Sequence, residues 1–146
     1  MEKPSYLTFE DMQIGLEGPA LTYTVTAEAV EKYALAVEHL DPLFLDDKVA
    51  AESEWGGRIA PPTGAAMFLL SPREIGGKLN PPGRVHAKQQ YEFHRPTRVG
   101  DVLTARTVVV DRYIKRERKY VAMETVVVDQ FGEKVVTSRG TSIWPF

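Results

Sequence analysis

The sequence predicts an α+β fold in which an antiparallel sheet packs against one buried helix. From residue 84 onward, apolar and polar residues alternate in long runs separated by turn residues, a pattern typical of antiparallel strands. Residues 63–70, in contrast, are apolar on nearly every side, and a helix of that kind is buried rather than amphipathic. The length of 146 residues fits a single domain that covers residues 1–146.

The first part of the chain predicts one strand and one amphipathic helix. Residues 21–26 are rich in β-forming side chains, and Thr26 can then cap a helix. Apolar residues at i, i+3, i+4 and i+7 form the buried stripe of that helix, namely Val30, Tyr33, Ala34 and Val37. Pro42 ends this helical region, because the residue before a proline is disfavoured in α geometry. A short helical turn is expected at residues 46–53.

The buried helix lies between an extended segment and a loop. Residues 59–62 end in Pro61-Pro62 and are expected to be extended. Ser71 and Pro72 stop the helix, and residues 73–83 are so rich in glycine and proline that they predict a loop.

The second half predicts a run of four strands. In the first strand, alternation places one set of side chains on one face: Val85, Ala87, Gln89, Tyr91 and Phe93. The other face carries His86, Lys88, Gln90, Glu92 and His94. Three longer strands follow at residues 102–114, 120–129 and 134–144. Together they predict an antiparallel meander.

Composition excludes several classes of protein. The net charge is -2, and no block of like charge reaches five residues, which argues against a nucleic-acid-binding protein. The chain has no cysteine, so it has no disulfide, thiolate nucleophile or cysteine-based metal site. No apolar run approaches the ~18 residues of a membrane span. We therefore expect a cytoplasmic protein that contacts neither nucleic acid nor membrane.

One loop carries a recognisable pattern: His39-Leu40-Asp41-Pro42-Leu43-Phe44-Leu45-Asp46, followed by Ala50. It resembles the substrate loop of the MaoC-like hydratases, which is Asp-x-Asn-Pro-hydrophobic-His-x-Asp with an Ala four residues later. Two further segments are similar to that family: Ile59-Ala60-Pro61-Pro62-Thr63 and Arg95-Pro96-x-Arg98-Val99-Gly100-Asp101-x-Leu103. The resemblance covers residues 6–144.

The loop departs from the family at its catalytic positions. The family's Asp falls on His39, its Asn on Asp41 and its His on Phe44. The chain is therefore most similar to the N-terminal subfamily that lacks the usual catalytic dyad. That subfamily often forms the non-catalytic half of a two-domain or two-subunit hydratase.

The resemblance implies a hot-dog fold, in which the sheet wraps around the central helix. It also implies the reversible hydration of an enoyl-CoA thioester in fatty acid metabolism, with no cofactor. A sheet of this kind has unpaired edges, which the family covers by joining two domains into one continuous sheet. We therefore expect a homodimer, or a hetero-oligomer with another hot-dog domain.

Two other functions stay open on the sequence. The chain can be a non-catalytic hot-dog subunit that pairs with a partner carrying the regular dyad. It can also be an acyl-CoA thioesterase, which we rank last because the central helix carries no decisive carboxylate.

Hydration of an enoyl thioester needs a base that activates water and an acid that protonates the α-carbon. His39 is the sharpest candidate because imidazole titrates near neutral pH, and Asp41 can orient it. Structural alternatives exist for both: a His at a helix end complements the helix dipole, and Asp-Pro is a common turn. Phe44 cannot transfer protons, so it lines an acyl pocket or fills the space of the family's His.

The thioester oxygen also needs hydrogen-bond donors. Pro61 and Pro62 have no N–H groups, so the first free amides of the buried helix are expected at Thr63, Gly64 and Ala65. The structural alternative is a helix start with a Thr cap and a Gly chosen for packing.

Other polar residues give weaker predictions. Arg73, Lys78 and Arg84 flank the Gly/Pro loop and either meet CoA phosphates or are simply solvated. His86 and His94 lie eight residues apart on one predicted strand, about 26 Å at ~3.3 Å per residue, too far to share a metal. We expect no metal site.

Overall fold

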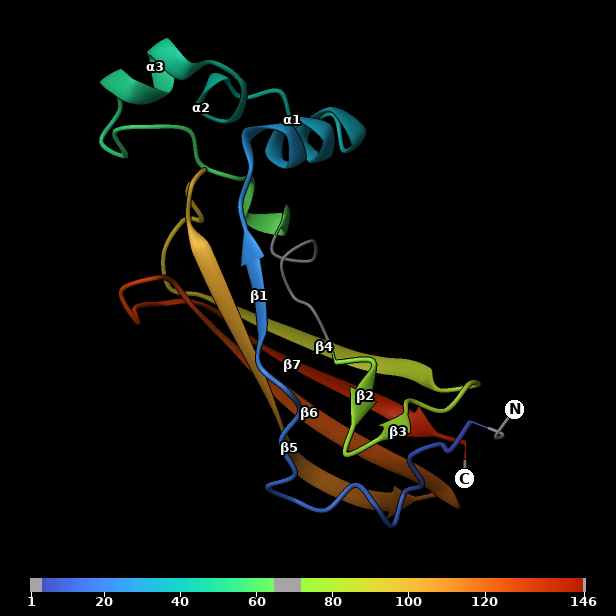
Figure 1. Ribbon diagram of the computed structural model, residues 1–146. Coiled ribbons are helices and arrows are strands. Elements are labelled where there is room, and N and C mark those ends of the chain that lie inside the picture. The colour runs from blue at the N-terminus through green and yellow to red at the C-terminus, as the bar shows by residue number, and fades with distance from the viewer. Residues whose placement is uncertain (1–3, 65–71, 146) are drawn as a thin grey trace.

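The computed structural model describes residues 4–64 and 72–145, which form one twisted antiparallel sheet with helices at one end (Figure 1). The sheet has five strands in the order β1-β5-β6-β7-β4. Its strands are β1 (Leu21–Thr24), β4 (Val85–Phe93), β5 (Val102–Lys115), β6 (Arg118–Val128) and β7 (Lys134–Trp144). The α+β prediction is therefore confirmed. The predicted meander is correct for β5, β6 and β7, but β4 pairs with β7 and not with β5, so it is wrong for the first of the four strands. No helix within these ranges is long and apolar enough to cross a membrane.

The helical layer consists of three helices beside the end of β1: α1 (Ala27–Ala36), α2 (Pro42–Leu45) and α3 (Asp47–Glu52). Thr26 caps α1 as predicted, because its hydroxyl accepts a hydrogen bond from the Ala29 amide at 3.2 Å. The predicted stripe is only partly correct. Val30 and Ala34 are buried, but α1 ends at Ala36 and Val37 is 47% exposed. Pro42 does not end α1; it begins α2, where its missing N–H costs no hydrogen bond.

The segment after the helical layer is extended, as expected. Ile59 forms a bridge with Arg98, and the Ala60 amide donates to the Thr97 carbonyl at 2.8 Å. A single 3₁₀ turn, η1 (Pro62–Gly64), follows. The helix predicted at residues 63–70 lies mostly outside the described residues.

The prediction of a loop at residues 73–83 is wrong in part. A small hairpin forms there from β2 (Glu74–Ile75) and β3 (Lys78–Leu79). Gly76 and Gly77 turn the chain with φ angles of 59° and 80°, the left-handed conformation that glycine adopts at no steric cost. Strands of two residues are too short to show alternation, so the pattern could not reveal them.

The predicted faces of β4 are wrong at its beginning, because a β-bulge interrupts the alternation. His86 pairs with Ser142 and Lys88 with Thr141, so Ala87 is the extra residue. A bulge moves the residues before it to the opposite face. His86 therefore lies on the same face as Gln89, and both approach Gly140.

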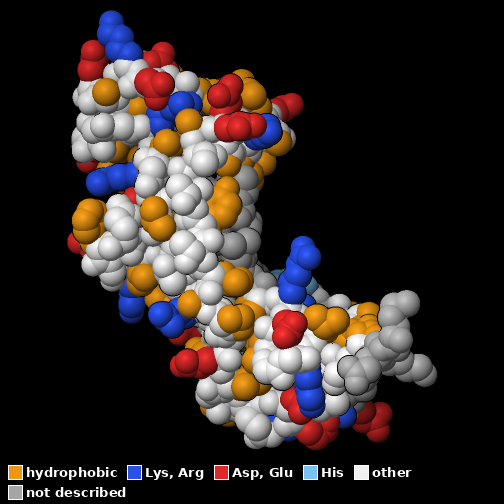
Figure 2. All heavy atoms as spheres, viewed as in Figure 1, with side chains coloured by type: hydrophobic (Ala, Val, Ile, Leu, Met, Phe, Trp, Pro, Cys, Tyr) orange, Lys and Arg blue, Asp and Glu red, His pale blue; other side chains and the backbone are white. Residues whose placement is uncertain are grey.

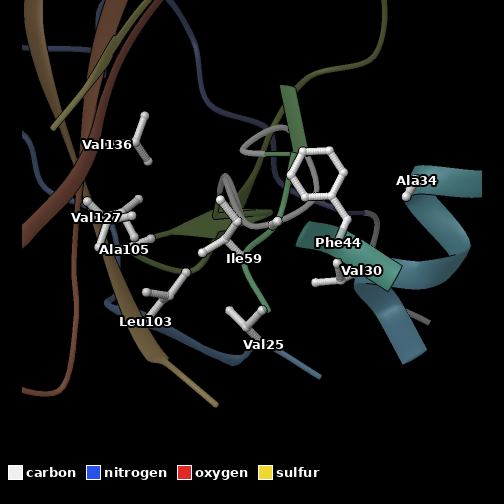
Figure 3. Packing of buried hydrophobic residues seen from close by; sticks show 11 residues of the cluster. Val25, Val30, Ala34, Phe44, Ile59, Leu103, Ala105, Val127 and Val136 are labelled. Atoms are coloured by element: carbon white, nitrogen blue, oxygen red, sulfur yellow. The ribbon is translucent and has the colours of Figure 1, made fainter. Parts of the chain in front are cut away.

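The inner face of the sheet carries two apolar clusters. The cluster nearer the helical layer joins Val30 and Phe44 to Ile59 and to Leu103 and Val127 of the sheet (Figure 3). The second cluster lies at the other end, where the chain start packs on the sheet through Phe9, Met12 and Trp144. A polar band separates the two, marked by the buried hydrogen bond between Thr107 Oγ1 and Thr125 Oγ1 at 2.8 Å.

Candidate functional site

The loop between α1 and α2 places His39 on the surface. The chain reverses at Glu38, which has a φ of 54°, and the His39 amide then donates to the Ala34 carbonyl at 2.9 Å. The imidazole is exposed and rests edge-on against the Phe44 ring, with centroids 4.8 Å apart and an angle of 80°. Such an edge-to-face contact restricts the imidazole while leaving its nitrogens open to solvent or ligand.

Asp41 is occupied by a helix cap. Its Oδ1 accepts a hydrogen bond from the Leu43 amide at 2.9 Å, which begins α2. Asp46 does the same for α3, where Oδ1 accepts from the amides of Lys48 and Val49. Within the described residues Asp41 and His39 share no hydrogen bond. The two side chains lie in one loop, but the structure does not pair them.

Phe44 connects this loop to the core. It is 5% exposed and packs in the cluster that contains Ile59 and Ala60 (Figure 3). The Leu43 carbonyl accepts a hydrogen bond from the Ile59 amide at 3.2 Å, which ties the loop to the extended segment before η1. Phe44 therefore holds His39 on one side and supports residues 59–60 on the other.

The turn at residues 61–64 offers fewer donors than expected. The Gly64 amide donates to the Pro61 carbonyl at 2.8 Å, so the expectation of an unpaired amide there is wrong. The reason is the tight 3₁₀ geometry, which closes i→i+3 bonds at the start of the turn. Gly64 also lies close to the Tyr33 ring, because a Cβ added to Gly64 would be 3.6 Å from the ring carbons. Thr63 is exposed, and Ala65 lies outside the described residues.

An apolar cavity of about 260 Å³ lies beside this turn. Residues 59–62 form one wall, and the other walls come from the end of β4, the residues after it and the start of β7: Phe93, His94, Arg95, Pro96, Thr97, Val135 and Val136. A cavity with apolar walls accommodates an alkyl or acyl group. Sequence reasoning missed this role of Phe93 and Val136, although both are apolar residues at paired positions of neighbouring strands.

His94 is the histidine that lines this cavity. Its Nε2 lies 2.9 Å from Thr137 Oγ1, and its amide donates to the Val135 carbonyl at 2.9 Å. The sequence placed His94 on the same face of β4 as His86, but the bulge at Ala87 puts the two on opposite faces. His94 is therefore tied to β7 at the edge of the cavity.

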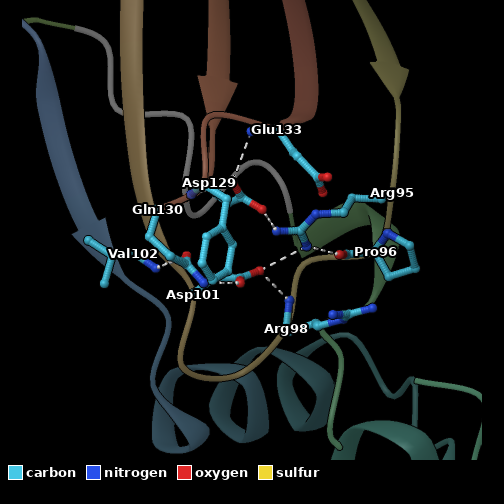
Figure 4. Close-up of polar contacts among 9 residues, drawn as sticks. Arg95, Pro96, Arg98, Asp101, Val102, Asp129, Gln130 and Glu133 are labelled. Carbon is cyan, nitrogen blue, oxygen red and sulfur yellow. Dashed lines mark hydrogen bonds and ion pairs between the residues drawn. The ribbon is translucent and has the colours of Figure 1, made fainter. Parts of the chain in front are cut away.

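A buried ionic network closes the same end of the sheet (Figure 4). Arg95 lies between Asp101 and Asp129, donating to Asp101 Oδ2 at 2.9 Å and to Asp129 Oδ2 at 2.5 Å. Both aspartates are 5% exposed. Burial raises the pKa of Asp129, but the bonds from Arg95 and from the amides of Glu133 and Phe131 outweigh it, so the pKa is lowered overall. The two carboxylates neutralise the charge of Arg95, so this arginine lines the neighbouring cavity without an unpaired charge.

Charged side chains of both signs lie at both ends of the face shown in Figure 2, over the helices at the top of the view and at the lower end. Of the basic residues that flank the Gly/Pro loop, Lys78 binds Asp11, with Nζ 2.8 Å from Oδ1. It is therefore not one of the solvated cations that the sequence suggested, whereas Arg73 is exposed.

Comparison with known proteins identifies relatives over most of the chain. Residues 12–138 match the model of the family described as FAS1-like, dehydratase domain region. A UPF0336 protein of Thermobifida fusca is 31% identical, over 80% of this chain and 80% of its own length. A 3-hydroxybutyryl-CoA dehydratase of Methylorubrum extorquens is 29% identical, over 85% of this chain and 77% of its own.

Solved structures share the fold. The MaoC-like dehydratase from Rhodospirillum rubrum superposes with a TM-score of 0.76 at 24% identity, over 96% of its chain and 94% of this one. The truncated HadBC complex of Mycobacterium tuberculosis, a 3R-hydroxyacyl-ACP dehydratase, gives 0.70 at 22% identity, over 96% of its chain and 88% of this one. These similarities confirm the predicted hot-dog fold.

Proposed function

Because the chain belongs to the FAS1-like dehydratase-region family, with a MaoC-like hot-dog fold, we propose that it is a hydratase or dehydratase component acting on an acyl-CoA thioester. The observation that carries this proposal is the apolar cavity of about 260 Å³ beside the Pro61-Pro62 turn. The cavity binds the acyl chain, and the thioester carbonyl lies at the turn that contains Thr63 and Gly64. Its apolar walls exclude water from the chain, and Phe44 links the wall residues Ile59 and Ala60 to the loop that carries His39.

In this proposal the thioester oxygen accepts hydrogen bonds from the amides of Thr63 and Ala65. The Gly64 amide already donates to the Pro61 carbonyl, so Gly64 contributes only by having no side chain that would obstruct the substrate. Donors fixed before the reaction stabilise the negative charge that develops on the oxygen.

His39 is the proposed acid and base. It removes a proton from water as the water oxygen bonds to the β-carbon, and the α-carbon takes a proton as the double-bond electrons shift towards it. The net reaction adds one water molecule, and dehydration is its reverse. The contact with Phe44 restricts the imidazole, and Asp41 acts on it only by fixing the α2 turn next to it.

A second candidate function is that of a subunit whose partner supplies the catalytic dyad. Two observations favour it. Phe44 fills the core at the position where the resemblance expects a catalytic His. All nine residues of β4 are exposed, and β4 is an edge strand, so its outer backbone edge is available to a second sheet. We propose that β4 pairs with a second hot-dog domain, either a second copy or a dyad-bearing partner.

The two functions are separated by assaying the purified chain alone on short trans-2-enoyl-CoA thioesters. The enzyme proposal expects loss of absorbance at the enoyl band, and expects His39→Ala to reduce kcat by about 100-fold or more, the range of general acid–base catalysis. Leu40→Ala is the matched control, because Leu40 is its exposed neighbour and carries no titratable group.

The outcomes are distinct. Activity of the chain alone that depends on His39 supports the enzyme. Activity that appears only after a dyad-bearing hot-dog protein is added, and survives His39→Ala, supports the subunit. Release of free CoA without a hydrated product would instead show the thioesterase, and no binding of any thioester would remove the proposal altogether.

A further inference from the structure

A polar pocket of about 130 Å³ opens on the inner face of the sheet, away from the apolar cavity. Arg84, just before β4, and the first half of β4 form one side of it, and β7 forms another. The residues that matter most are Arg84, His86, Gln89, Ser138, Gly140 and Ser142. Neither the hydration chemistry nor the ionic network of Figure 4 uses any of them.

The bulge in β4 and a glycine in β7 build this pocket. The bulge at Ala87 turns His86 to the face of Gln89. Opposite them, Gly140 has no side chain; a Cβ there would lie 3.2 Å from Gln89 Oε1 and 3.6 Å from His86 Cε1. Any larger residue at position 140 would therefore occupy the space between these side chains.

The pocket is rich in donors and contains no carboxylate. Gln89 Nε2 donates to Ser138 Oγ at 2.7 Å. The hydroxyls of Thr107 and Thr125, which also line the pocket, are hydrogen-bonded to each other. Three side chains that can donate hydrogen bonds are left, beside the acceptor Gln89 Oε1: the guanidinium of Arg84, the imidazole of His86 and the hydroxyl of Ser142. Within residues 4–64 and 72–145 none of these three side chains has a hydrogen bond or an ion pair.

Arg84 is the unusual member. Its Cζ lies 5.2 Å from the centre of the Trp144 ring, which is 3% exposed. Burial lowers the pKa of Arg84, and no carboxylate of the described chain opposes this effect. A desolvated cation without a counter-ion is costly, and an anion that reaches it is bound correspondingly well.

We propose that this pocket is a binding site for a small oxyanion, a carboxylate or a phosphate group. Arg84 supplies the charge, and His86 and Ser142 supply further hydrogen bonds. A volume of about 130 Å³ equals roughly four water molecules at ~30 Å³ each. That is enough for one such group and a short stem, and too little for a nucleotide. The site is independent of the hydration chemistry proposed above.

The test uses Trp144 as the reporter. The chain has two tryptophans, so Trp55→Phe leaves the ring beneath Arg84 as the only one. This variant is titrated with sodium phosphate and, separately, with sodium acetate, and sodium chloride at equal ionic strength is the reference. A saturable change in Trp144 fluorescence with either salt, absent with chloride, is the expected result.

Adding Arg84→Gln is expected to weaken that binding by about tenfold or more, because the charge-assisted bonds are lost. Arg106→Gln is the matched control, since Arg106 is an exposed arginine of β5 outside this pocket, and it is expected to change the affinity less than twofold. Binding of phosphate alone identifies a phosphorylated ligand, and binding of acetate alone identifies a carboxylate ligand.

Gly140→Val keeps Arg84 but fills the pocket. Its Cβ would lie 3.2 Å from Gln89 Oε1, so the flexible end of the Gln89 side chain has to shift to make room for it. Gly140→Val is also expected to abolish anion binding. If circular dichroism shows that Arg84→Gln does not fold, Gly140→Val is the variant that tests the proposal. The proposal is wrong if neither salt gives a saturable change, or if both pocket variants bind as tightly as the control.

Discussion

Two arginines flank strand β4, and the structure uses them in opposite ways. Arg95 follows the strand and is neutralised by Asp101 and Asp129, which accept its hydrogen bonds (Figure 4). Arg84 precedes the strand, lies over Trp144 and meets no carboxylate within the described residues. The comparison teaches that burial alone does not assign a role to a charged residue. Its partners decide whether it holds the fold together or is left for a ligand.

The largest expected difference between the two arginines is in stability. Arg95→Ala leaves two buried carboxylates without a counter-ion and is expected to lower the free energy of unfolding by about 3–5 kcal/mol. Arg84→Ala leaves no carboxylate without a counter-ion, because Arg84 pairs with none within the described residues. The free energy of unfolding is therefore expected to fall by about 1 kcal/mol or less. Urea unfolding followed by circular dichroism measures both, and equal losses would contradict the distinction.

The apolar cavity at the Arg95 end is probed by changing the size of Phe93, which is half exposed and lines one wall. Phe93→Ala enlarges the cavity and is expected to shift kcat/KM towards longer acyl chains by about tenfold, the usual effect of one or two methylene groups. Phe93→Trp is expected to shift the preference towards shorter chains. Phe131→Ala, in the exposed turn after β6, is the control. If both Phe93 variants keep the wild-type chain-length profile, the acyl group does not lie in this cavity.

The two arginines also differ in how they couple stability to pH. The pKa of Asp129 is lower in the folded than in the unfolded chain, so its stabilisation is present above the unfolded value near pH 4 and is lost as the pH falls through the folded pKa. Arg95→Gln is expected to flatten this acid dependence, and Arg84→Gln is expected to leave it unchanged. Thermal melting between neutral pH and pH 3 compares the slopes; a flattened slope in the Arg84 variant would show that Arg84 also pairs with a carboxylate.

The smallest expected effect comes from the partly exposed pair of Lys78 and Asp11. The Lys78 hydrogen bond and the Thr8 amide lower the pKa of Asp11 to about 2, from 3.8. The stabilisation is present above pH 3.8 and is lost as the pH falls to about 2. Asp11→Asn is expected to lower the melting temperature slightly at neutral pH, and the difference from wild type is expected to vanish at about pH 2. A constant difference over this range would exclude the ion pair as its cause.

The fold was predictable where the pattern is long. Three strands of the second half, β5, β6 and β7, run for eleven or more residues, and Thr26 marks the start of α1. The sequence predicts that Pro42 ends a helix, although it begins α2. The resemblance supplied the hot-dog arrangement, which periodicity alone does not distinguish from other helix-on-sheet folds.

The sites were less predictable because they depend on local irregularities. Nothing in the sequence marks Ala87 as a bulge, so the inward position of His86 could not be foreseen. The bond from the Gly64 amide to the Pro61 carbonyl depends on a 3₁₀ turn that the proline pair does not specify. The partners of Arg95 come from residues 6 and 34 positions further along the chain, which only the folded sheet brings together.

A crystal structure with a short saturated acyl-CoA tests the central assignment most directly, because this thioester keeps the carbonyl group but has no double bond to hydrate. We predict that its acyl carbons lie against Ile59, Ala60 and Phe93, with the carbonyl oxygen facing the amide of Thr63. An acyl group bound elsewhere, with this cavity still empty, would contradict the assignment.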